Sequence, residues 1–103
     1  MSMRSWPLAQ IVIEKRRYAI LRHLHDSPGR ELSAEILKHG CRSQGIPSDD
    51  DEIAGALAWL EAQGLVVQDA AAPIRTARLA PAGHDVVRGH ATVAGILVFG
   101  DAV

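Results

Sequence analysis

Two pairs of residues in this chain have the chemistry of metal ligands: His23-x-His25 and His39-x-Cys41. Imidazole and thiolate groups are good ligands for zinc. In a helix, however, residues two apart point about 200° away from each other, and the chain holds no Cys-x-x-Cys or His-x-x-x-His pair. We therefore expect no metal ion and no other cofactor.

Cys41 is also the one thiol that could act as a nucleophile. A nucleophilic cysteine needs an organised base and an oxyanion site, and the neighbouring residues supply neither. The sequence has no phosphate-binding glycine loop, no serine nucleophile elbow and no paired-carboxylate motif. We therefore expect no enzymatic activity and no small-molecule substrate.

The length of 103 residues, with 48% hydrophobic and 22% charged residues, is typical of one folded domain. The longest apolar run, Ile96 to Phe99, is far shorter than the roughly 20 residues that cross a bilayer. Charged residues from Glu14 to Arg17 interrupt any signal peptide. A single cysteine forms no internal disulfide. We expect a cytoplasmic protein that makes no contact with a membrane.

Charge is distributed unevenly along the chain. Residues 1–30 hold six basic and two acidic residues, whereas residues 31–69 hold two basic and eight acidic residues. A basic surface for DNA must therefore be assembled mainly from the first and last thirds of the chain.

Apolar spacing predicts a first helix from about residue 8 or 11 to residue 25, stopped by Ser27, Pro28 and Gly29. Its core stripe is predicted to contain Ile13, Ile20, Leu21 and Leu24. Arg17 falls at the centre of this stripe, so we expect it to be buried beside a carboxylate such as Glu61.

A second helix is predicted over residues 33–44. Ser33 is its expected N-cap, Ile36 and Leu37 are its expected core contacts, and Gly45 ends it.

The third helix is the best-specified element of the sequence. Ser48 or Asp49 can cap its start, with Asp51 or Glu52 reaching back three residues later as in a capping box. Gly64 ends it, and Trp59 is expected to pack partly beneath the hairpin that follows. One face should be buried, because three apolar residues are spaced at i, i+4 and i+7: Ile53, Leu57 and Leu60.

After the third helix, residues 65–68 and 75–79 predict two strands of a β-hairpin around a six-residue loop. Pro81 then begins a short last helix that ends at Gly89. The order predicts a mainly α fold with a small β-hairpin: a winged helix-turn-helix over residues 1–90, with a three-helix core, a two-stranded wing and a short C-terminal helix. The apolar segment 91–103 is expected to dock on its own domain or at the interface of a homodimer.

Several stretches resemble the small winged-helix proteins of Mu-like phages and prophages. They are Leu57-Ala-Trp-Leu-Glu-Ala-Gln-Gly-Leu-Val66, Leu79-Ala-Pro-Ala-Gly83 and Arg16-Arg-Tyr-Ala-Ile-Leu-Arg22. The resemblance covers roughly residues 11–96. It implies a winged-helix fold and a role in phage gene regulation, with double-stranded DNA as the partner.

Two functions stay open from the sequence. In the first, the chain is a homodimeric transcriptional regulator that contacts DNA through residues in the wing, late in the second helix and at the start of the third helix: Arg75, Arg78, Lys38, Arg42 and Ser48. In the second, it is a winged-helix module that docks on another protein. The outer face of the third helix favours the second function, because Asp51, Gly55, Ala58 and Ala62 carry no donor for a base edge. A continuous positive strip would favour DNA.

Overall fold

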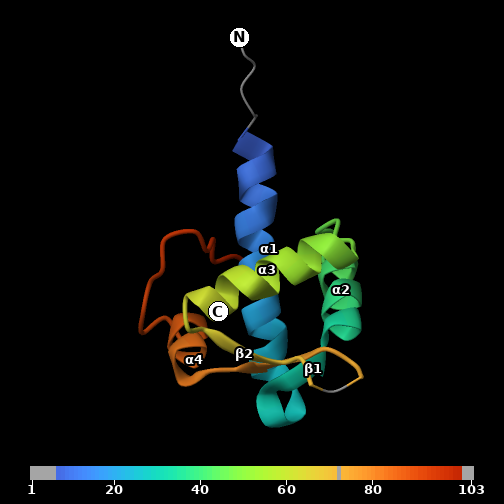
Figure 1. Ribbon diagram of the computed structural model, residues 1–103. Helices are drawn as coiled ribbons and strands as arrows, with labels where there is room; N and C mark the ends of the chain where they lie inside the picture. Colours follow the sequence, from blue (N-terminus) through green and yellow to red (C-terminus); the bar gives the residue numbers. More distant parts are fainter. Residues whose placement is uncertain (1–6, 72, 101–103) are drawn as a thin grey trace.

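The computed structural model describes residues 7–71 and 73–100. These residues form four α-helices and a small three-stranded antiparallel sheet in one mainly helical domain (Figure 1). The helices are α1 (Pro7–Asp26), α2 (Ala34–Ser43), α3 (Asp50–Ala62) and α4 (Pro81–Val87). The strands are β1 (Glu31–Ser33), β2 (Val66–Asp69) and β3 (Thr76–Leu79), and a short 3-10 turn, η1 (Pro28–Arg30), joins α1 to β1.

Local side-chain chemistry sets the ends of α2 and α3. Ser33 caps α2 by accepting a hydrogen bond from the backbone N–H of Ile36. Asp49 and Glu52 form the complete capping box of α3, with contacts of 2.7 and 3.0 Å. Gly45 and Gly64 follow the two helices with φ of 78° and 77°, a left-handed conformation that glycine adopts without strain. The predicted caps and stops are confirmed.

The sheet has the strand order β1-β3-β2. The predicted hairpin is confirmed, since β2 pairs with β3 from Val66 opposite Leu79 to Asp69 opposite Thr76. Strand β1 was not predicted, so the expected two-stranded wing is one part of a three-stranded sheet. β1 is only three residues long and pairs with β3, with Glu31 opposite Arg78. Such a short segment has no alternation of its own to reveal it.

The core lies between α1, α2, α3 and the inner face of the sheet. Of the predicted core residues in α1 and α3, all but Ile13 are buried. The largest fully buried side chains come from every layer: Ile20, Leu21, Leu24, Leu37, Ile53, Leu57, Leu60 and Val66.

Two expected core residues lie near the surface instead. Ile13 is 37% exposed because it lies close to the first turns of α1, which extend beyond the rest of the domain (Figure 1). Ile36 is 54% exposed because α2 is short and Leu37 and Cys41 form its buried face. Both residues follow the apolar spacing of their helix, but no neighbouring helix or strand covers either position.

The sequence predicted that Arg17 enters the core, but the buried arginine is Arg16. Arg16 is 5% exposed and its guanidinium group reaches the segment between α2 and α3. Arg17 is partly buried, where it stacks on the Trp59 ring at 3.9 Å and donates a 2.9 Å hydrogen bond to the carbonyl of Gly95. Glu61, its expected partner, binds Gln68 instead.

The segment from residue 91 to residue 100 docks on its own domain. Val93, Ile96 and Phe99 pack against the core, and the Phe99 ring meets the Tyr18 ring edge-on at 5.5 Å. The Trp59 ring lies next to Gly95 of this segment on one side and stacks with Arg17. Self-docking accounts for Val93, Ile96 and Phe99, whereas Leu97 and Val98 remain exposed, and homodimerisation stays a prediction. Residues 101–103 of the predicted tail lie outside the described residues.

Candidate interaction surface

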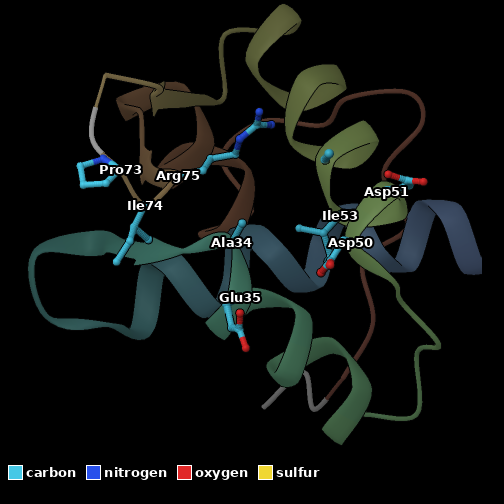
Figure 2. Close-up of a pocket in the computed structure, with 9 residues that line it drawn as sticks. Ala34, Glu35, Asp50, Asp51, Ile53, Pro73, Ile74 and Arg75 are labelled. Carbon is cyan, nitrogen blue, oxygen red and sulfur yellow. The ribbon is translucent and has the colours of Figure 1, made fainter.

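A groove opens between the first turns of α2 and α3 and the loop that joins β2 to β3 (Figure 2). Its cavity volume is about 460 Å³. Figure 2 shows Pro73 and Ile74 on the hairpin side and Asp50 and Asp51 on the α3 side. Nine residues line it: Ala34, Glu35, Asp50, Asp51, Ile53, Ala54, Pro73, Ile74 and Arg75.

Helix capping places three carboxylates in this groove. The Ser33 cap starts α2 so that Glu35 falls in its first turn, and the Asp49 capping box does the same for Asp50 and Asp51 in α3. Acidic side chains in a first turn are stabilised by the helix dipole, typically by about 0.3–1 kcal/mol each. The same dipoles that could attract a phosphate are thus already facing carboxylates.

Lys38 is committed to one of these carboxylates. Its Nζ lies 2.9 Å from Oδ1 of Asp50. Hydrogen bonding and attraction from Lys38 lower the pKa of Asp50, and Arg42 adds a smaller effect in the same direction. A Lys38 side chain held in this way contributes little positive potential to the surface.

The basic residues expected to contact DNA come from the hairpin and from α2, and acidic side chains lie among them. Arg75 lines the groove together with the three carboxylates, and Arg42 lies exposed at the far end of α2. Arg78 is exposed on the outer face of the sheet, where it is flanked by Glu31 on one side and Val67 on the other. The groove therefore places carboxylates beside Arg75 and, through Asp50, against Lys38.

Ser48 does not lie on this surface. It is only 4% exposed, accepts a 2.9 Å hydrogen bond from Nε of Arg16 and donates one to the carbonyl of Ile46. Its hydroxyl is used within the fold, and its expected contact with DNA stays a prediction. The sequence offered Ser48 as a helix start, and Asp49 takes that role.

Sequence reasoning missed Glu35 and Ile74 as surface residues. Glu35 is separated in the chain from the acidic start of α3, and only the packing of α2 against α3 brings them to one groove. Ile74 is 63% exposed in the hairpin loop. An isoleucine next to Pro73 in an otherwise small-residue loop was the available indication.

Two features considered from the sequence, the Cys41 thiol and a metal site, can be examined in the described part of the chain. Burial raises the pKa of the Cys41 thiol to about 11, so the thiol is protonated and poorly nucleophilic. Among residues 7–71 and 73–100, no three histidine, cysteine, aspartate or glutamate side chains are grouped to hold a metal ion. Within the same residues, no helix is both long and apolar enough to cross a bilayer.

A second, mixed-charge surface lies where α1 meets α4. The rings of His25 and His84 stack with their centroids 5.1 Å apart. Loss of hydration lowers the pKa of His84 from its ordinary value of 6.5, with smaller effects from Arg30, His25 and Arg88 that outweigh the opposing effect of Asp85.

Acidification is therefore expected to destabilise the domain. The pKa of His84 is lower in the folded state than in the unfolded state, so the unfolded state binds more protons as the pH falls through about 6.5. The urea midpoint should therefore decrease as the pH is lowered from about 8 to about 5, and the decrease should be smaller in His84→Gln. The matched control is His90→Gln, at an exposed position after α4, which should keep the wild-type pH dependence. A His84→Gln curve identical in slope to that of the wild type would contradict the assignment.

One curated relative aligns with nearly the whole chain. It is "Uncharacterized protein gp26" of Escherichia phage Mu, which is 34% identical over 86 residues, covering 84% of this chain and 88% of the phage protein. The chain belongs to the family of phage Mu gp26. This membership agrees with the resemblance to Mu-like phage proteins. No established family profile and no solved structure matches the chain.

The relationship to phage Mu gp26 does not identify a ligand for this chain. The name of gp26 specifies no binding partner. The groove between α2, α3 and the hairpin has a larger volume than three other surface pockets of the described residues, which measure about 160, 170 and 270 Å³. It is lined by both charged and apolar side chains.

Proposed function

We propose that this gp26-family chain is a winged-helix domain that docks on another protein and does not read DNA sequence. The order helix, strand, helix, helix and hairpin supports the winged-helix assignment. One observation carries the functional part of the proposal. The groove at the start of α3, where a winged helix would face DNA, is lined by Glu35, Asp50 and Asp51.

Electrostatics argues against DNA at this surface. Phosphate contacts need hydrogen-bond donors and positive charge, and base reading in the major groove needs Arg, Lys, Asn or Gln on the entering helix. The exposed face of α3 instead presents Asp51, Gly55 and Ala58. A duplex brought to this face would place its phosphates next to carboxylates, and Lys38 is already paired with Asp50.

The hairpin keeps DNA binding as a second candidate, because Arg75 and Arg78 are exposed on it. Arginine side chains of a wing suit the phosphate backbone or a narrow minor groove. Two arginines with an acidic groove on one side and Glu31 on the other form a small basic surface. Such a surface supports weak, salt-sensitive attachment more readily than sequence recognition.

The first test is binding to random duplex DNA by fluorescence anisotropy. We expect no binding by the wild-type chain at about 50 mM salt, and measurable binding by Asp51→Lys, because the variant removes a repulsive charge from the groove and adds an attractive one. The gained affinity should fall by about threefold between 50 and 200 mM salt for each phosphate contacted.

The control for this test is Glu14→Lys, which makes the same change of charge on α1, outside the groove. It should leave the chain unable to bind DNA. Wild-type binding at low salt that disappears in the double variant Arg75→Ala/Arg78→Ala would overturn the proposal in favour of a DNA-binding hairpin.

A further inference from the structure

We infer that the groove binds a protein segment that presents a lysine or arginine beside an aliphatic side chain. This inference rests on the proposed function and adds the chemistry of the partner. It follows from two properties of the groove: an apolar floor and rim, and a surplus of negative charge.

The apolar part of the groove can accept an aliphatic side chain. Ile53 is buried beneath it, and Ala34 and Ala54 are partly exposed along it. Both alanines end at Cβ, so they leave open the space that a larger residue would fill. Ile74, 63% exposed, stands on the hairpin side next to Pro73 (Figure 2). A bound aliphatic group would be covered by both sides and would remove exposed Ile74 from water.

The charged part of the groove determines which side-chain charge a partner should carry. Glu35, Asp50 and Asp51 face one positive side chain within the lining, Arg75, while Lys38 approaches Asp50 from outside the groove. His39 lies 3.4 Å from Glu35 on the same helix. Single exposed ion pairs contribute little to affinity, so the carboxylates act mainly by favouring cationic partners and rejecting anionic ones.

The dimensions of the groove fit a segment of polypeptide. A volume of about 460 Å³ lies within the roughly 300–1,000 Å³ that holds a drug-sized molecule, which is enough to receive side chains of a docked segment. The groove is open to solvent, so a chain can enter and leave it. An anionic ligand such as a nucleotide or a nucleic acid phosphate would meet Glu35 and Asp51 beside the Lys38–Asp50 pair.

The test uses three short synthetic peptides of equal length. The first combines lysine, leucine and serine; the second replaces lysine with glutamate; the third replaces leucine with serine. Amide shifts in ¹⁵N NMR spectra locate the site and give Kd. We expect the lysine–leucine peptide to shift the amides of Asp51, Ala54 and Ile74, and to bind at least about tenfold more tightly than either other peptide.

Two variants check the site. Asp51→Asn removes a carboxylate outside the capping box and should weaken the lysine–leucine peptide, whereas Asp85→Asn, the same change on α4, should not. Ala54→Trp should block the groove and abolish peptide binding. A circular dichroism spectrum checks that this variant folds. If it does not fold, Asp51→Asn still tests the site.

The possible failures are distinguishable. Equal binding of the lysine and glutamate peptides, or shifts confined to residues outside the groove, would overturn this inference and leave the proposed protein-docking function standing if DNA is still not bound. Groove shifts that grow with protein concentration in the absence of peptide would assign the groove to a second copy and would also overturn it. Duplex DNA binding through the hairpin would overturn both proposals.

Discussion

Gly83→Ala is expected to destabilise the domain by about 2–3 kcal/mol, although alanine is the better helix former. Gly83 is buried in α4, and a Cβ atom there would collide with the Leu65 carbonyl oxygen and lie 2.7 Å from Cδ1 of Leu79. The Leu65 carbonyl cannot move freely, because it accepts a 3.0 Å hydrogen bond from the N–H of Ala80. Thermal unfolding should show a Tm lower by roughly 10–20 °C.

Gly55 supplies the matched control for this prediction. It lies on the exposed face of α3, and nothing stands within 4 Å of the Cβ that alanine would add. Gly55→Ala should therefore stabilise the chain by about 0.5–1 kcal/mol. The opposite signs at the two positions isolate the close approach of α4 to Leu65. A Gly83→Ala variant at least as stable as the wild type would show that α4 does not pack as described.

Arg16→Met is expected to cost about 2–4 kcal/mol. Arg16 is 5% exposed, donates hydrogen bonds of 2.9 Å to Oγ of Ser48 and 2.6 Å to the carbonyl of Pro47, and lies 3.6 Å from Glu52. Methionine fills much of the space but leaves those acceptors without their donor. Because Pro47 and Ser48 immediately precede α3, the variant should also weaken peptide binding in the groove.

Chemical denaturation separates this effect from a general loss of charge. Arg42→Met removes an exposed arginine and should change the free energy of unfolding by less than about 0.5 kcal/mol. Arg16→Lys should not restore full stability, because an ammonium group lacks the planar fork that reaches Ser48 and Pro47 together. An unchanged urea midpoint for Arg16→Met would remove Arg16 from its assigned role in positioning α3.

The site was predictable only in part. The acidic start of α3 and the exposed arginines Arg75 and Arg78 were evident from residue types and capping rules. Their combination into a groove was not, because Ala34 and Ile74 are forty residues apart in the chain and meet only after β1 pairs with β3. The neutralisation of Lys38 by Asp50 likewise joins two helices and has no local sequence indication.

The sequence by itself determined the features that depend on near neighbours. The capping box of Asp49 and Glu52, the glycine stops at Gly45 and Gly64, and the buried face of α3 all arise from residues a few positions apart. Only the tertiary structure decided which arginine is buried, whether residues 31–33 form a strand, and where the segment 91–100 docks. Arg16 and Ser48 are 32 positions apart, and Glu31 and Thr76 are 45 apart. Contacts over such separations depend on how helices and strands pack, which the spacing within a single helix or strand does not specify.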